Sequence, residues 1–144
     1  MKQKMKNHLN YYNMDIKLKY SKIIPLPRFY ACTIFNCIFR NPRYKNNPLS
    51  KTTYNHESIH VAQQLDFVGG NDKLYILGGC VFYILYFIEW LIKLIVSGFT
   101  LGKVKAYRSI SHEIEAYTNE KNLDYLQNRK RFTWCKYIFK LIWK

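Results

Sequence analysis

The stretch TTYNHESIHVAQQLDF (residues 52–67) carries two histidines four positions apart, with a glutamate directly after the first. Thr52 or Thr53 can cap the start of a helix, and Gly69 and Gly70 follow the stretch as a stop signal. A helix is therefore predicted between these signals. This helix would bring both histidines to one side of the chain.

In a helix, residues four positions apart lie one turn apart on the same face. His56 and His60 can therefore direct two imidazole rings at one tetrahedral zinc ion. Glu57 lies beside them, where it could take a proton from a zinc-bound water. This HExxH arrangement is the pattern of metal-assisted hydrolysis. The alternative is a surface helix that carries two unrelated histidines.

A catalytic zinc site needs three protein ligands and a water, so a third ligand must come from elsewhere in the chain. The segment KAYRSISHEIEAYTNEKNLDYL (residues 105–126) predicts a second helix, which Ser109 or Ser111 could cap and which would run to about Gln127. This helix carries one histidine and several glutamates. It is therefore the expected source of the third ligand.

One glutamate of this helix falls on its apolar stripe. The stripe has the spacing i, i+3, i+4, i+7 and contains Ile110, Glu113, Ile114 and Tyr117. A carboxylate that faces a core is costly unless it is paired or bound to metal, so Glu113 is predicted as the third ligand. Glu115 is expected to face solvent. Two alternatives stay open: a salt bridge of Glu113 to a lysine or arginine, and His112 as the ligand or as a donor to the substrate.

An HExxH helix followed by a distal glutamate resembles the gluzincin class of zinc metallopeptidases. In the membrane-linked branch of that class, the third ligand stands in an E-x-x-A-D pattern, whereas residues 113–117 read EIEAY. Tyr117 thus replaces an aspartate whose carboxylate would orient a ligand histidine. Glu120 or Asp124 could take that role.

The chain from about residue 24 to 140 is also similar to a set of short, uncharacterised HExxH proteins. They share an NHExIH…Q helix, an aromatic apolar segment with Y…IEWLI(K/R)LI, and a later YR.IS.E.EAY.NE…LDYL..R segment. The resemblance implies a zinc metallopeptidase in which His56, His60 and Glu113 hold Zn²⁺ and Glu57 is the general base. It implies no particular peptide or protein substrate. Candidates for stabilising the oxyanion are His112, Tyr117 and Tyr125.

The segment LYILGGCVFYILYFIEWLIKLIVSG (residues 74–98) is apolar enough to suggest a transmembrane helix. Only Glu89 and Lys93 interrupt it, and their i, i+4 spacing lets them pair. A helix that spanned a bilayer would place His60 and Glu113 on opposite sides. We therefore predict a helix that lies in the core or in the membrane without crossing it, and a true span is the alternative.

The charge of the chain fits an anionic partner. Its 144 residues carry a formal net charge of +14, although a composition bias without any ligand is an equal interpretation. Residues 129–144 predict a basic helix with an aromatic apolar face, which suits a membrane surface or packing against the domain. Nucleic acid is not expected as a partner because no recognisable binding module is present. Membrane association is therefore expected through 74–98 and 129–144.

The expected fold is α+β and predominantly α-helical, a minimal zincin-like domain. Residues 1–22 are predicted to be a basic, flexible tail, and 23–144 a single domain. That domain would contain a short N-terminal β element within 23–43, the HExxH helix, the apolar helix, the glutamate-bearing helix and a basic C-terminal helix. The four cysteines form no CxxC pair and are expected to be free thiols.

The expected location is the cytoplasmic side of a membrane, with the cytoplasm as the alternative. Secretion is not expected, because the basic N-terminus lacks the apolar core of a signal peptide. The alternative function is a non-enzymatic, basic, membrane-associated module whose histidines are structural or vestigial. A homo-oligomer is also considered, because so small a chain leaves little room for a substrate cleft.

Overall fold

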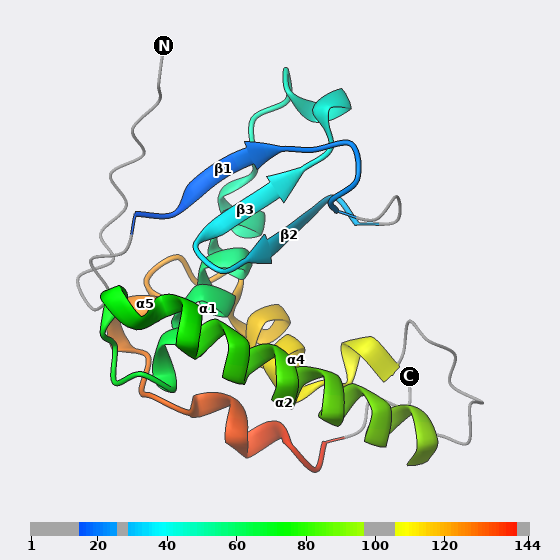
Figure 1. The fold of residues 1–144 in the computed structure, drawn as a ribbon, viewed down its shortest axis with the longest axis vertical. Coiled ribbons are helices and arrows are strands. Elements are labelled where there is room, and N and C mark those ends of the chain that lie inside the picture. The colour runs from blue at the N-terminus through cyan, green and yellow to red at the C-terminus, as the bar shows by residue number, and fades with distance from the viewer. Residues whose placement is uncertain (1–14, 26–28, 97–105, 141–144) are drawn as a thin grey trace.

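The computed structural model describes residues 15–25, 29–96 and 106–140 (Figure 1). Over these ranges the fold is α+β and mainly helical, which confirms the predicted class. A small sheet lies at one end of helix α1 (Lys51–Asp66), and the long helix α2 (Tyr75–Val96) packs across α1 (Figure 1). The sheet and α2 therefore meet at the helix that carries the HExxH motif.

The sheet has three strands, β1 (Lys17–Tyr20), β2 (Ala31–Ile34) and β3 (Cys37–Arg40), in the order β1-β3-β2. β3 pairs in parallel with β1 and antiparallel with β2. A two-residue turn connects β2 to β3, and its first residue, Phe35, has φ 52°. β1 lies within the stretch 1–22 that was predicted to be a flexible tail, so the sheet begins before residue 23. Residues 1–14 lie outside the described residues.

Helix α1 begins earlier than predicted. Its N-cap is Ser50, whose hydroxyl accepts a hydrogen bond from the Thr53 amide at 3.0 Å, so neither Thr52 nor Thr53 is the cap. The helix ends at Asp66, and Gly69 follows with φ 67°, as the predicted stop signal requires. A 3₁₀ helix, η1 (Pro42–Tyr44), precedes it.

The core forms around the C-terminal three quarters of α1, where every residue from Asn55 to Asp66 is buried. Its apolar cluster comes from α1 and from two later helices, and consists of Ile59, Val61, Ala62, Leu65, Ala116 and Leu126. A polar helix such as α1 is buried on all sides only if its polar groups find partners within the protein. The polar residues of α1 are thus expected to belong to internal networks.

A 3₁₀ helix, η2 (Asp72–Leu74), leads into α2, which confirms a helix over most of the predicted range 74–98. Two glycines let α2 approach closely: a Cβ at Gly78 would lie 2.4 Å from the Gln64 carbonyl oxygen, and one at Gly79 would lie 2.5 Å from the Phe35 ring. The helical run Asp72–Val96 is long and apolar enough to cross a membrane, and most of it is exposed.

The C-terminal part of the chain differs from the prediction. In place of one helix to Gln127, the structure has α4 (Ser111–Asn119) and α5 (Tyr125–Asn128), separated by a turn. The predicted basic helix over 129–144 is a short 3₁₀ helix, η3 (Thr133–Tyr137), which packs on α4, and residues 141–144 lie outside the described residues. All four cysteines are free, as expected.

Candidate metal centre

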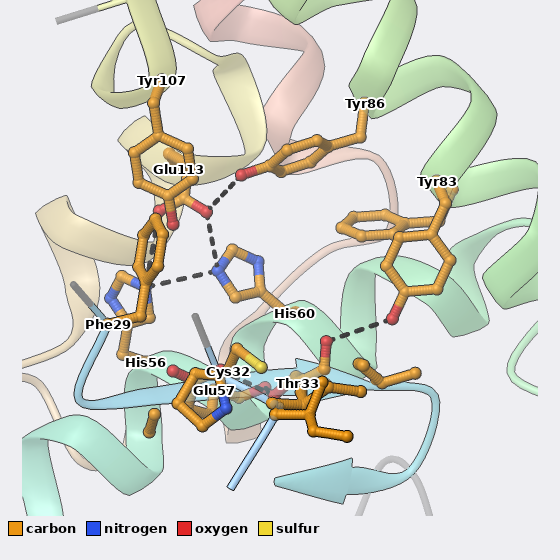
Figure 2. A pocket seen from close by; sticks show the side chains of 16 residues that line it. Phe29, Cys32, Thr33, His56, Glu57, His60, Tyr83, Tyr86, Tyr107 and Glu113 are labelled. Atoms are coloured by element: carbon orange, nitrogen blue, oxygen red, sulfur yellow. Dashed lines mark hydrogen bonds and ion pairs between the residues drawn. The ribbon is translucent and has the colours of Figure 1, made fainter. Parts of the chain in front are cut away.

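Three side chains from two helices converge beside the pocket shown in Figure 2. α1 supplies His56 and His60, α4 supplies Glu113, and all three side chains are buried. The two Nε2 atoms lie 3.3 Å apart, His60 Nε2 lies 3.3 Å from Glu113 Oε1, and His56 Nε2 lies 3.6 Å from Glu113 Oε2. The structure thus brings together the three residues that the sequence predicted as ligands.

The three residues offer donor types that zinc binds, two imidazole nitrogens and a carboxylate oxygen. One such atom from each residue lies within 4.8 Å of the others. The distances from His60 and His56 to Glu113 end on Oε1 and Oε2, respectively. The cluster could therefore hold a metal ion through three protein ligands.

The hydrogen bonds on the far side of each imidazole fix its tautomer. Nδ1 of His56 lies 2.9 Å from Glu120 Oε2, and Nδ1 of His60 lies 2.9 Å from Gln63 Oε1. Both oxygens only accept, so both Nδ1 atoms carry the proton. Each Nε2 lies toward the other and toward the Glu113 carboxylate, where a proton on His60 or a bound cation can offset the negative charge.

The orientation of Gln63 is itself fixed by acceptors. Its amide nitrogen donates to the His112 carbonyl and to Glu115 Oε2, each at 3.0 Å, so its oxygen must face His60. Next to His56, the Asn55 amide donates to three carbonyls at the end of α4 and in the turn that follows it, those of Asn119, Glu120 and Asn122. Asn55 therefore holds in place the turn that carries Glu120, the carboxylate partner of His56.

The electrostatics of the site favour positive charge. Burial disfavours the imidazolium form of His60, but the neighbouring Glu113 carboxylate outweighs burial and raises the pKa of His60 to about 9. Burial likewise opposes the ionised form of Glu113, yet His60 and His56 hold the pKa of this carboxyl well below its usual range. Glu113 is thus an anion that can serve as a metal ligand.

Glu57 lies in the same pocket but outside the group of ligand atoms. Thr33 on the edge strand β2 donates from its hydroxyl to Glu57 Oε2 at 2.7 Å, which orients the carboxylate (Figure 2). A carboxylate that is held next to a metal site without binding the metal can act as a base toward a water in the fourth position. The role of Glu57 as a general base stays a prediction.

The pocket that contains these residues has a volume of about 430 Å³ and is lined mainly by apolar and aromatic side chains. Tyr86 on α2 donates to Glu113 Oε1 at 2.7 Å, and Tyr107 also lines the pocket (Figure 2). Burial, reinforced by the Glu113 charge, raises the pKa of both phenols, so both hydroxyls stay protonated donors. Tyr86 could not be singled out by sequence reasoning, because it lies inside the apolar run.

None of the three predicted oxyanion helpers lines this pocket. The Tyr125 hydroxyl donates to Glu115 at 2.7 Å, and the ring of His112 stacks on Trp134 with a centroid distance of 4.1 Å. The ring of Tyr117 packs against His56 at 4.6 Å. Among these tyrosines, Tyr86 and Tyr107 line the pocket and Tyr117 and Tyr125 do not, and His112 is not part of the ligand group.

Glu115 was predicted to face solvent, but it is 0% exposed, so this prediction is wrong. Its carboxylate accepts hydrogen bonds from Arg129 at 2.6 Å, from Tyr125 at 2.7 Å and from Gln63 at 3.0 Å. Arg129 also forms a bidentate pair with Asp66 at 2.8 and 2.9 Å. The polar face of α4 is therefore buried against α1 through an ionic network that the helical pattern alone does not reveal.

No family model, curated protein or solved structure matches the chain.

Proposed function

We propose that the protein is a zinc-dependent peptidase. The observation that carries this proposal is the convergence of His56, His60 and Glu113, whose ligand atoms lie within 4.8 Å of one another. An oxygen lies 2.9 Å from Nδ1 of each imidazole, and a separate carboxylate, Glu57, lines the same pocket. Three protein ligands and an open fourth position are typical of catalytic zinc sites, whereas structural sites are closed by four.

Each pocket residue then has a role. Zn²⁺ held by the three ligands would lower the pKa of a water near it and polarise the scissile carbonyl. Glu57, oriented by Thr33, takes the proton from the water and passes it to the leaving amine. The hydroxyls of Tyr86 and Tyr107 are protonated donors that can stabilise the developing oxyanion.

The edge strand β2 favours a peptide as the substrate. All four of its residues line the pocket, and within the described residues it pairs with a neighbouring strand only on the β3 side. An extended peptide can add to such an edge through backbone hydrogen bonds, with its side chains in the adjoining pocket. The apolar lining favours a bulky apolar side chain next to the scissile bond.

Metal content and hydrolysis test this proposal. The protein purified without chelator should carry about one zinc per chain, and His56→Ala and His60→Ala should each lose it. Glu57→Gln should keep the zinc and lose hydrolysis of an unstructured peptide by roughly 10²–10⁴-fold. If Glu57→Gln lost as much zinc as His56→Ala, the role assigned to Glu57 would be wrong.

We also propose that the protein works on the cytoplasmic side of a membrane. Four free thiols fit a reducing compartment, and α2 is long and apolar enough for a membrane helix. His60 and Glu113 lie 3.3 Å apart, so their helices lie on one side of α2, which favours attachment without crossing. Recovery of the expressed protein in the soluble fraction would support the alternative, a cytoplasmic protein.

A further inference from the structure

Helix α2 exposes an unbroken apolar stripe. The stripe follows the spacing i, i+7, i+11, i+14, i+18 and consists of Leu77 (57% exposed), Ile84 (61%), Ile88 (45%), Leu91 (41%) and Ile95 (57%). The opposite face, with Gly78 and Phe82, is buried against the rest of the chain. A soluble monomer rarely exposes so continuous an apolar surface, so something is expected to cover it.

The two charged residues of α2 are turned away from this stripe. Glu89 and Lys93 pair at 2.8 Å, as their spacing predicted. Glu89 also accepts from the Ser111 amide at 2.8 Å and from its hydroxyl at 2.6 Å, and Lys93 donates to the Ser109 carbonyl. Both charged side chains of α2 therefore bind the chain at the start of α4. The exposed face contains no group that needs water.

A groove of about 480 Å³ lies next to the stripe, between α2 and η3. Most of its lining is apolar and comes from Leu85, Ile88, Ile92, Val96, Trp134, Ile138 and Phe139. The Glu89–Lys93 pair and His112 complete the lining. Phe139 is 97% exposed, so its whole ring adds to the apolar surface. Since Ile88 belongs to both the stripe and the groove, the two form one continuous apolar surface.

The segment beside this surface is strongly basic. Residues 130–140 contain Lys130, Arg131, Lys136 and Lys140, all exposed, and no acidic residue. The whole chain has a formal net charge of +14. Such charge opposes the approach of a second copy of the chain and attracts anionic lipid head groups, so charge complementarity favours a lipid as the partner.

We propose that α2 and the segment 130–140 form a docking surface for an anionic bilayer. The stripe lies in the interface between head groups and acyl chains, an acyl chain of a membrane lipid occupies the groove, and the basic residues contact the head groups. The helix lies parallel to the membrane and does not cross it. This surface shares no residue with the metal ligands, so it is independent of the proposed peptidase function.

Vesicle flotation tests the surface. The protein should float with vesicles of phosphatidylcholine containing about 30% phosphatidylserine, and much less with phosphatidylcholine alone. The double variant Ile84→Glu/Ile88→Glu should stay at the bottom of the gradient with both. Leu18→Glu/Leu123→Glu, which places the same two charges at exposed apolar residues outside α2 and the segment 130–140, is the matched control and should float like the wild type.

The charge contribution has its own measurement. Lys136→Gln/Lys140→Gln removes two exposed cations and should weaken binding to the serine-lipid vesicles by roughly 30-fold, since each cation near an anionic surface contributes about 1 kcal/mol. Because the changed residues are exposed, circular dichroism should show wild-type helix content in every variant. His56→Ala should float like the wild type, which separates this surface from the metal centre.

Three outcomes would overturn the proposal. Flotation of Ile84→Glu/Ile88→Glu at the wild-type level would show that the stripe does not bind lipid. Labelling of single cysteines at Asn71 and at Arg108, in a background without the native four, from opposite sides of the vesicle by an impermeant reagent would show a helix that spans the bilayer. Light scattering that finds a dimer in the wild type and a monomer in Ile84→Glu/Ile88→Glu would show that the stripe is an interface between two copies.

Discussion

The hydrogen bond between His60 and Gln63 provides a direct test of how the metal centre is organised. In a Gln63→Met variant, the new side chain has a similar length and can remain in the core, but it cannot accept the proton of His60 Nδ1. It also cannot donate to Glu115, which keeps its bonds from Arg129 and Tyr125. His60 is then free to carry its proton on Nε2, the atom that would bind zinc.

The structure sets the size of two effects. Loss of the outer partner of a ligand histidine weakens metal binding by roughly 10–100-fold, so the zinc Kd of Gln63→Met should rise by about 30-fold. The apo protein loses the buried hydrogen bonds of Gln63 to His60, to the His112 carbonyl and to Glu115, which costs about 1–3 kcal/mol of stability. A domain of ordinary stability stays folded after such a loss, so both effects can be measured.

Competition with a chromogenic chelator gives the zinc Kd, and urea unfolding of the apo protein gives the stability. Gln64→Met is the matched control: Gln64 is the next residue and is also buried, but its side chain lies toward Gly79 of α2. Its zinc Kd should equal that of the wild type. A wild-type Kd for Gln63→Met, or an equal loss for Gln64→Met, would refute the positioning role of Gln63.

Two further predictions concern buried charges. Glu115→Ala removes one carboxylate partner of the buried Arg129, and it should lower the free energy of unfolding by about 3 kcal/mol while the purified protein keeps its zinc; unchanged stability in urea unfolding would contradict the buried network. Burial opposes the charge of Glu89, but hydrogen bonds from His112, Lys93 and Ser111 lower its pKa from 4.5 to about 2. The contribution of the Glu89 carboxylate to stability is complete above about pH 4.5 and is lost as the pH falls toward 2. The free energy of unfolding of Glu89→Gln should therefore change less with pH across that interval than that of the wild type. An equal pH dependence in both proteins would count against this role of Glu89.

The residues of the candidate site could be found from the sequence because local periodicity decides them. The i, i+4 spacing of His56 and His60 fixes a common face on any helix, and the stripe containing Glu113 showed which side of its helix turns inward. The same reasoning identified the Glu89–Lys93 pair, which the structure confirms at 2.8 Å. Each of these inferences needs only the geometry of one helix.

The failures have a common cause, which is a partner that lies far away in the sequence. Glu115 belongs to the polar face of α4, and only the return of Arg129 toward Asp66 turns that face into buried structure. Tyr86 appears in the sequence as one of many apolar residues, and its role depends on α2 packing across α1. Helical periodicity shows which residues share a face, but it does not show what the rest of the chain places against that face.

Helix α2 links the two proposals because its opposite faces belong to different sites. Phe82 and Tyr86 face the pocket, whereas Ile84 and Ile88 are exposed on the proposed docking surface. A helix with its side chains is about 10–12 Å across, so on a docked protein the pocket lies roughly that far from the bilayer. A substrate segment that reaches the edge of β2 would then run close to the membrane surface.

We therefore expect vesicle-bound wild-type protein to cleave a peptide anchored to the same vesicles faster than the same peptide in solution. Ile84→Glu/Ile88→Glu should lose this preference and should cleave the peptide in solution at the wild-type rate. If both proteins preferred the anchored peptide equally, the docking surface would have no role in the choice of substrate.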